Sequence, residues 1–454
     1  MSLTIQLYPF QEQGVRKIER RNGRVILSDE MGLGKTVQAI EYFKRNDIGP
    51  VVIVTPASLK WHWENQVARQ TGITSDVLSG MSPRKVGLAN NKVTIVNYDI
   101  LHAWLPYLQK INPQMVIFDE AHYLRTTTSR RFKAAKELVR DVDKLLLLTG
   151  SPIVNRPIDL YPLLHLLHPR KFKSLRRFGF RFCNPRRQFG KWVFRGARNH
   201  EQLHKTLKKY GMIRRLKKNV LDQLPPEQSS MVPLTLSKKS MREYEHAQLT
   251  ASKWLKNNYK PGQNDKRMEA FTMIGELKQL AASLKLELVY EWIDNWLESS
   301  KEKLIVFGHH HKIIATLVER YKDMCAVVTG KTPGPQRRER FEAFNASKKC
   351  RLFFGNLVAA GTGWSARACS NVAKIEIDWL PGNHTQASAR THGVGRGQEG
   401  KVSMTHWLVA KGTIEETLCK MVQDKQADID RIVDGKKLGA LNLFDQLVEV
   451  LRGM

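Results

Sequence analysis

The chain has 454 residues, 42% of them hydrophobic, and its 74 lysines and arginines against 43 aspartates and glutamates give a formal net charge of +31. This apolar fraction excludes a disordered polycation, because such chains have too few apolar residues to bury a core. The charge favours a polyanionic partner, either nucleic acid or an anionic membrane surface. No apolar run approaches the ~20 residues that span a bilayer, and residues 1–10 lack a secretory pattern. We therefore expect no membrane association and a cytoplasmic protein, or a nuclear one in a eukaryote.

Short apolar runs alternate with helical patterns in two parts of the chain. In the first part, strands are expected at 24–28, 51–55, 93–97, 115–119 and 145–149. In the second part, they are expected at 304–307, 325–329, 351–354, 374–378 and 402–408. Continuous apolar strands separated by helices are typical of a parallel sheet that helices cover on both faces. The sequence therefore predicts an α/β protein with two doubly wound parallel-sheet lobes.

The segment between the two sets of strands is strongly basic. Residues 170–218 contain eighteen lysines and arginines and a single acid, Glu201, with aromatic residues interleaved in the first half. An aromatic subdomain with a solvated basic face and a DNA-binding face are compatible interpretations of this pattern. Helical spacing follows over 237–300. The expected domains are a first lobe at 1–165, a basic, mainly helical insertion at 166–285, a second lobe at 286–426 and a bracing helix at 427–454.

The sharpest local signal is DEMGLGKT at residues 29–36, between the first expected strand and a helical pattern. Glycines let backbone N–H groups surround phosphate oxygens, and the start of a helix adds the positive end of its dipole. Lys35 would reach the β- and γ-phosphates, and Thr36 would ligate Mg²⁺. Asp29 stands where the usual pattern has glycine. The expected cofactors are ATP and Mg²⁺, and the expected nucleotide contacts in this loop are Asp29, Met31, Gly32, Leu33, Gly34, Lys35 and Thr36.

An acidic pair, Asp119 and Glu120, ends the expected strand at 115–119. Nucleotide sites of α/β sheets lie at the carboxyl ends of the strands. Mg²⁺ takes one or two carboxylates and keeps several waters, so Asp119 would hold it largely through water. Glu120 would then orient and deprotonate the attacking water. The pair could instead cap a helix, but its occurrence together with the glycine-rich loop favours catalysis.

These motifs together resemble the superfamily 2 helicase-like ATPases, and their order along the chain is the same. Three further segments support the resemblance: LYPFQ at 7–11, LTGSP at 148–152, and RRLKKNVLDQLPPE at 214–227. The last is similar to the RRxKxxVxxxLPxK signature of the SWI/SNF-type branch, with Glu227 in place of the final lysine. The resemblance implies RecA-like lobes and a Gln11 that reads the adenine edge. It also implies nucleic-acid backbone contacts at Pro56, Ser58, Asn97, Tyr98, Gly361, Thr362 and Gly363.

The segment from Gln386 to Gln398 resembles the arginine-finger motif QAxDRxHRxGQ of this family. Arg390 matches the first arginine, but Ala389 and Gly393 replace the aspartate and the second arginine. In the family, an arginine of the second lobe stabilises the transferring phosphoryl group, which is worth roughly 10³–10⁵ in rate in other NTPases. We favour Arg390 as a sensor and Arg396 as the candidate finger, and both assignments stay open.

The resemblance implies a DNA-dependent ATPase that translocates on double-stranded DNA and remodels or anneals forked DNA. A strand-separating superfamily 2 helicase is the enzymatic alternative, and a DNA-binding scaffold with a degenerate ATPase is the non-enzymatic one. The expected partners are double-stranded or branched DNA and a targeting protein, and the expected state is a monomer. In the basic insertion, the expected duplex contacts are Arg176, Arg177, Arg186 and Arg187.

Overall fold

The computed structural model describes residues 6–81, 92–153, 156–188, 190–220, 227–259, 266–360, 364, 366–391, 402–434 and 443–453. The chain forms two compact units, Met1–Asp222 with Asp428–Leu441, and Gln223–Ala427 with Asn442–Met454. The segment 166–285 is thus divided between both units. The predicted boundaries of a separate insertion at 166–285 stay a prediction. So do those of a bracing helix at 427–454. None of the described helices is long and apolar enough to cross a membrane.

The first unit contains a sheet whose described strands follow the order β3-β4-β2-β5-β6-β1-β9. All neighbouring strands in it are parallel. The strands are β1 (Arg24–Leu27), β2 (Val51–Thr55), β3 (Ser75–Val77), β4 (Val93–Asn97), β5 (Met115–Asp119), β6 (Lys144–Leu148) and β9 (Met212–Ile213). The five strands predicted for this lobe are confirmed within one residue at each end. The short strands β3 and β9 were not predicted.

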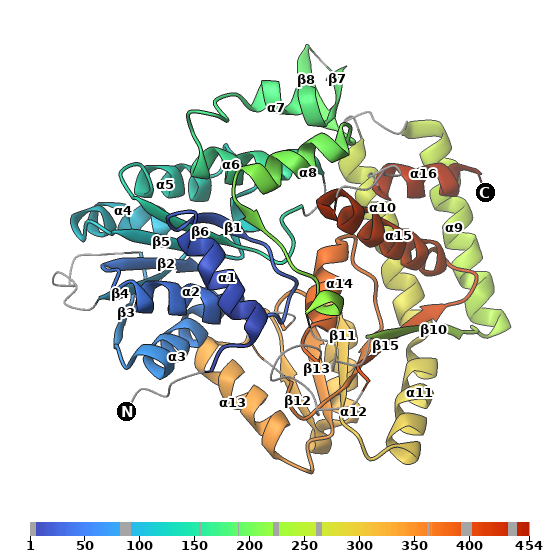
Figure 1. Cartoon of the computed structure of the whole chain (residues 1–454). Helices are drawn as coiled ribbons and strands as arrows, with labels where there is room; N and C mark the ends of the chain where they lie inside the picture. Colours follow the sequence, from blue (N-terminus) through green and yellow to red (C-terminus); the bar gives the residue numbers. More distant parts are fainter. Residues whose placement is uncertain are drawn as a thin grey trace. The chain divides into compact units, whose positions relative to one another are not determined.

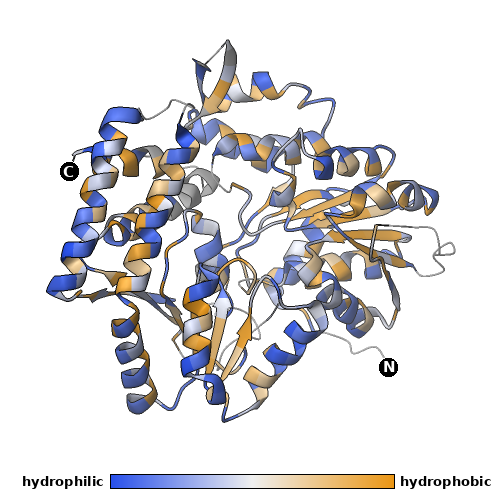
Figure 2. Ribbon diagram, turned by 180° about the vertical axis from the view of Figure 1, so that it is seen from behind, coloured by the Kyte–Doolittle hydropathy of each residue, from blue (hydrophilic) through white to orange (hydrophobic). Residues whose placement is uncertain are grey.

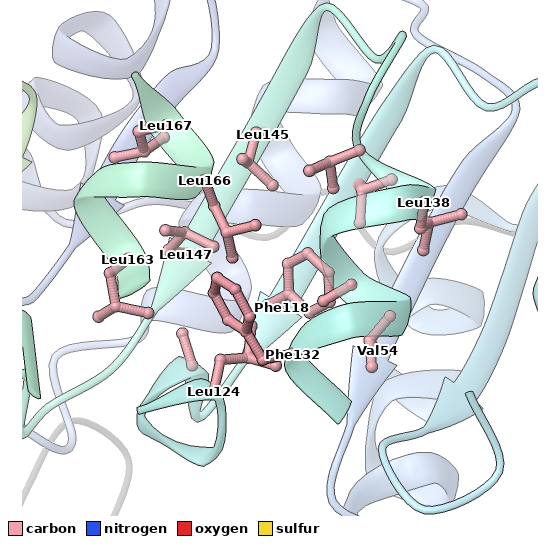
Figure 3. Packing of buried hydrophobic residues seen from close by; sticks show 14 of the residues in the cluster. Val54, Phe118, Leu124, Phe132, Leu138, Leu145, Leu147, Leu163, Leu166 and Leu167 are labelled. Carbon is pink, nitrogen blue, oxygen red and sulfur yellow. The ribbon is translucent and has the colours of Figure 1, made fainter. Parts of the chain in front are cut away.

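Helices cover both faces of this sheet. Successive residues of a strand point to opposite faces, so an apolar strand needs a cover on each. One face packs against α1 (Pro9–Glu19), α2 (Lys35–Arg45) and α3 (Lys60–Thr71), and Ile53 and Ile117 lie in that cluster. The other face packs against α4 (Leu101–Lys110), α5 (Arg130–Leu138) and α6 (Tyr161–Leu167). There Phe118 and Leu147 of the strands lie against Phe132 of α5 (Figure 3). Burial on both faces explains why these strands are apolar throughout.

The basic part of the first unit combines helices with a hairpin. Helix α7 (Leu175–Phe182) is followed by antiparallel strands β7 (Asn184–Gln188) and β8 (Lys191–Arg195), and then by α8 (His200–Lys209). Figure 1 shows the hairpin at the tip of the first unit, away from its sheet. Helix and hairpin pack closely, since a Cβ at Gly179 would lie only 2.5 Å from Cγ of Phe194. The segment expected to be mainly helical thus also contains a small β-hairpin.

The second unit is built on a parallel sheet with the described strand order β10-β15-β14-β11-β13-β12. The strands are β10 (Gln228–Leu234), β11 (Leu304–Gly308), β12 (Cys325–Val328), β13 (Leu352–Asn356), β14 (Asn371–Lys374) and β15 (Met404–Ala410). Helices α11 (Leu286–Ser299) and α12 (His311–Arg320) cover one face, and α13 (Gly334–Ala346) covers the other. A further cluster joins α9 (Lys238–Asn258), α10 (Arg267–Leu284), α15 (Ile414–Asp434) and α16 (Leu443–Gly453). The predicted fold class, two doubly wound parallel-sheet α/β lobes, is confirmed, and Figure 2 shows the apolar strands of each.

One predicted strand, at 374–378, is wrong in position. Strand β14 ends at Lys374, although Ile375 and Ile377 are both buried. The neighbouring strand β11 ends at Gly308, and the next two backbone amides, of His309 and His310, donate to the Glu376 side chain instead. The alternation of apolar residues therefore continues past the end of strand β14. The strand itself ends earlier, because the backbone amides that follow β11 donate to a side chain and not to the backbone of residues 375–378.

Candidate active site

The phosphate loop connects β1 to the first turn of α2. Gly32 and Gly34 have φ values of +90° and +74°, which favour glycine, and Gly34 caps the helix. Lys35 is the first residue of α2, and its Nζ donates to the backbone oxygen of Asp29 at 2.9 Å. Gly150, in the loop after β6, packs closely against the phosphate loop. A Cβ at this position would lie 2.5 Å from Cγ of Met31 and 3.4 Å from Nζ of Lys35. A helix N-terminus, a lysine and a glycine-lined wall are what phosphate binding requires.

Asp29, which takes the place of the first glycine of the usual motif, does not face a ligand with its side chain. The residue is fully buried. Its carboxylate accepts hydrogen bonds from Nε of Arg215 at 3.0 Å, from Nη2 of Arg215, and from Nε2 of Gln38 at 3.1 Å. We therefore correct the predicted nucleotide contact of Asp29 as far as its side chain is concerned. Both carboxylate oxygens already accept hydrogen bonds from Arg215 and Gln38, and their negative charge would repel the phosphates.

Gln11 lies directly beside the loop. Its Nε2 donates to the backbone oxygen of Leu33 at 3.2 Å, and its Oε1 accepts the amide of Tyr8 at 3.1 Å. Gln11 is 3% exposed, so in this state the side chain holds the start of α1 against the phosphate loop. Its predicted role in reading adenine stays a prediction.

Asp119 ends β5 within a dense set of donors. Its Oδ2 accepts the indole N–H of Trp63 at 2.8 Å and the hydroxyl of Thr55 at 3.3 Å, and its Oδ1 accepts the amide of Glu120 at 3.0 Å. Burial, and then the adjacent charge of Glu120, raises the pKa of Asp119 to about 6, while Trp63 and Lys35 act in the opposite direction. A carboxylate oxygen at this strand end is a donor of the kind that Mg²⁺ takes.

Glu120 has φ of +50°, an uncommon backbone conformation for a residue with a side chain. Its Oε2 lies 3.2 Å from Nδ1 of His122, and that nitrogen lies 3.3 Å from the hydroxyl of Thr149. The same hydroxyl accepts the amide of Ser151 at 3.2 Å. Strand β6, which leads to Thr149, lies between β5 and β1 in the sheet. A continuous polar chain therefore connects Glu120 with the loop after β6.

The residues predicted to contact a nucleic-acid backbone in the first unit differ in exposure. Pro56 is buried and Ser58 is half-buried at the short helix η1 (Ala57–Leu59). Asn97 is 6% exposed and Tyr98 is 2% exposed. The Tyr98 ring stacks on Phe118, and its hydroxyl donates to the backbone oxygen of Asp119 at 2.7 Å. We therefore correct the DNA contact predicted for the Tyr98 side chain: this tyrosine supports the end of β5 from inside the core.

The four arginines predicted to contact the duplex are exposed, on α7 and on β7 of the hairpin. The guanidinium of Arg176 lies over the rings of Phe180 and Trp192, 5.6 and 5.9 Å from their centroids. Such stacking restricts the conformations of the arginine side chain. Arg177, Arg186 and Arg187 are exposed as well, and the last two, adjacent in β7, point to opposite faces of the hairpin. We call these four arginines together the arginine surface. Its contact with DNA stays a prediction.

In the second unit, Arg390 follows α14 (Pro381–Ser388) and is 7% exposed. Its Nε donates to the backbone oxygen of Gln386 at 3.0 Å, and its Nη1 donates to that of Trp364 at 2.7 Å. Arg390 thus joins the end of α14 to the segment at residue 364. The other predicted residues of this unit, Gly361, Thr362, Gly363 and Arg396, lie outside the described residues.

Several residues of the site were not predicted as such. Each of four side chains contacts either Asp29 or Asp119: Trp63, Thr55, Gln38 and Arg215. Arg215 lies within a signature that was recognised, but its partner Asp29 is 186 positions away in sequence. No local pattern indicates such a pairing.

Comparison with known proteins agrees with this geometry. The model of the SNF2-related domain matches residues 10–286, and that of the helicase conserved C-terminal domain matches residues 284–395. The chain is 31% identical to the mouse (Mus musculus) DNA annealing helicase and endonuclease ZRANB3, over 96% of this chain and 41% of that protein. It is also 31% identical to the Xenopus tropicalis SWI/SNF-related matrix-associated actin-dependent regulator of chromatin subfamily A-like protein 1, over 92% of this chain and 44% of that protein.

A similar solved structure is the Sulfolobus solfataricus SWI2/SNF2 ATPase core in complex with double-stranded DNA, with 21% identity and a TM-score of 0.45. The match covers 99% of this chain and 96% of that one. The chain spans less than half the length of the two curated relatives named above. Since one family model covers more than half of its residues, the chain belongs to the SNF2-related family and continues into a helicase conserved C-terminal domain.

Proposed function

We propose that this protein is a DNA-dependent ATPase that moves along double-stranded DNA and remodels or anneals forked DNA. The observation that carries the proposal is the arrangement at the carboxyl ends of β1, β6 and β5. Lys35 is the first residue of α2, and Asp119 and Glu120 lie at the end of β5. Thr149 follows β6, the strand between β1 and β5, and His122 contacts both Thr149 and Glu120. Phosphate binding, a carboxylate for a cation and a candidate base thus belong to one sheet.

The residues present fit ATP and Mg²⁺. The positive φ values of Gly32 and Gly34 give a loop whose backbone amides could surround a phosphate, and Lys35 would neutralise its negative charge. The hydroxyl of Thr36 and the carboxylate of Asp119 are the hard oxygen donors that Mg²⁺ takes. When bound, Mg²⁺ supplies positive charge to the phosphate oxygens.

Glu120 would orient the attacking water and accept its proton. The contact with His122 places that glutamate in reach of Thr149, so that a movement of the loop after β6 would alter the orientation of the base. An arginine of the second unit would stabilise the transferring phosphoryl group. Arg396 is the candidate, because the Arg390 side chain is engaged with two backbone oxygens of its own unit.

DNA is the polyanion that best fits the arginine surface. Backbone contacts by arginine carry no sequence information, which suits a protein that moves along a duplex. The relatives include a protein named as a DNA annealing helicase, which supports forked DNA as the substrate. We propose translocation on the duplex over strand separation on the basis of the family. The monomeric state, a targeting partner and the cellular location stay predictions.

The test is phosphate release from ATP by the full chain, with and without duplex DNA. We expect DNA to stimulate the wild type and Lys35→Ala to be inactive. Lys44→Ala is the matched control, because Lys44 lies at the other end of α2 and donates to the backbone oxygen of Gln70. Equal background release by wild type and Lys35→Ala would reject the ATPase and leave the scaffold alternative. Separation of a forked duplex without displacement of a triplex strand would favour the helicase alternative.

A further inference from the structure

The phosphate loop is attached to the segment that leads from the first unit into the second. Strand β9 pairs with β1, and the pairing continues beyond both strands. The amide of Ser28 donates to the backbone oxygen of Ile213 at 2.7 Å, and the amide of Glu30 donates to that of Arg215 at 2.9 Å. The amide of Lys217 in turn donates to the Glu30 side chain at 2.8 Å. The first half of the phosphate loop therefore follows the course of residues 213–217.

The side chain of Arg215, in this segment, holds the start of the phosphate loop from the protein interior. Besides its two hydrogen bonds to the Asp29 carboxylate, it donates to Oε1 of Gln38 on α2 at 2.7 Å and to the backbone oxygen of Phe10 on α1. Its side chain is 9% exposed and that of Asp29 is fully buried. A single guanidinium thus joins the start of the loop, the helix after it and the helix before it.

The sequence of α1 makes room for this guanidinium. Gly14 lies in the interior of α1, where glycine is less favourable for a helix than alanine. A Cβ at this position would lie 2.5 Å from Nη2 and 2.9 Å from Nη1 of Arg215, and it would also overlap the Gln38 side chain. The glycine is explained by the arginine that passes beside it.

We propose that Arg215 is a positioning residue for nucleotide binding. By holding Asp29, it keeps the phosphate loop in the shape in which Gly32, Gly34 and Lys35 can receive a phosphate, and it does so without touching the nucleotide. Asp29, which stands in place of the usual glycine, supplies the carboxylate that anchors this guanidinium. The inference rests on the proposed nucleotide site, and it adds a residue outside the motif that binds the nucleotide.

The test is binding of a fluorescent ADP to the full chain, together with KM and kcat for ATP. We expect Arg215→Gln to weaken ADP binding at least tenfold and to raise KM similarly, while kcat at saturating ATP falls less than threefold. The matched control is Arg24→Gln. Arg24 starts β1 at the end opposite to the loop, and its guanidinium donates to backbone oxygens of Val142 and Leu166. We expect this variant to lower the melting temperature and to keep ADP affinity within twofold.

A double-variant comparison adds a readout that general destabilisation would not reproduce. If Arg215 acts through Asp29, the combination of Asp29→Asn with Arg215→Gln weakens ADP binding no further than Arg215→Gln alone. Additive losses would contradict the proposal. So would ADP affinity within twofold of the wild type in Arg215→Gln, or an equal loss in Arg24→Gln.

Gly14→Ala keeps every charge and serves for the case in which Arg215→Gln does not fold. We expect it to weaken ADP binding at least threefold, although alanine favours the helix itself. Unchanged ADP affinity in folded Gly14→Ala would overturn the role of Arg215. A wild-type protein that binds no ADP would overturn the nucleotide site as well, which separates the two failures.

Discussion

Tyr98→Phe separates two roles for a residue that the family resemblance implied to be a DNA contact. The substitution removes one hydroxyl and leaves the ring stacked between Phe118 and Tyr123. The hydrogen bond that it removes, 2.7 Å long, ends on the backbone oxygen of Asp119 in the core. A buried neutral hydrogen bond contributes about 1–2 kcal/mol once the unsatisfied acceptor is included. At about 2–4 °C per kcal/mol for a unit of this size, the melting temperature should fall by about 2–8 °C.

The assays are thermal unfolding by calorimetry and binding of a fluorescent duplex without nucleotide. We expect the lower melting temperature together with duplex affinity within twofold of the wild type, because Tyr98 is 2% exposed. Tyr123→Phe is the matched control: it removes a hydroxyl from the ring stacked on Tyr98, with centroids 5.3 Å apart, and keeps the hydrogen bond to Asp119. An unchanged melting temperature with several-fold weaker duplex binding would refute the role in the core and restore the DNA contact.

Three further outcomes are expected. Replacement of all four arginines of the arginine surface by glutamine should weaken duplex binding for all DNA sequences. The slope of log K against log salt should become shallower by about 0.9 for each phosphate that the protein no longer neutralises. An unchanged slope would show that the DNA binds elsewhere. Burial lowers the pKa of Lys374 to about 7, below its ordinary 10.5, so the folded state holds fewer protons than the unfolded state in that range and stability rises with pH. The melting temperature of the wild type relative to Lys374→Met should therefore increase from pH 7 to pH 10, and a constant difference would show that Lys374 does not titrate there. At least one of Arg390→Ala and Arg396→Ala should lose DNA-stimulated hydrolysis at saturating ATP, and normal turnover by both would reject an arginine finger at either position.

The sheet cores could be predicted from the sequence because their signals are local. Runs such as Val51–Thr55 and Met115–Asp119 are buried on both faces, so nearly every residue is apolar and the run ends where the strand does. Strands β9 and β10 gave no such signal. The first has two residues, and the second is an edge strand that contains Pro233, which a central strand would not tolerate.

The candidate site divides in the same way. Lys35, Asp119 and Glu120 could be named from short motifs, because a phosphate loop and an acidic strand end each occupy a few consecutive residues. The partners that fix them could not, since Trp63 reaches Asp119 and Arg215 reaches Asp29 across long separations in sequence. Tyr98 shows the opposite error. A residue at a strand end was assigned to DNA by resemblance, while the direction of its side chain depends on packing against Phe118.

The most direct test of the proposed motor is displacement of a third strand from a blunt duplex by the full chain. We expect the wild type to displace the strand only with hydrolysable ATP, and Glu120→Gln to bind the duplex with wild-type affinity but displace nothing. Displacement that is equally fast without ATP or with Glu120→Gln would contradict the coupling of this site to movement on DNA. So would DNA-stimulated ATP hydrolysis by the wild type that leaves the third strand in place.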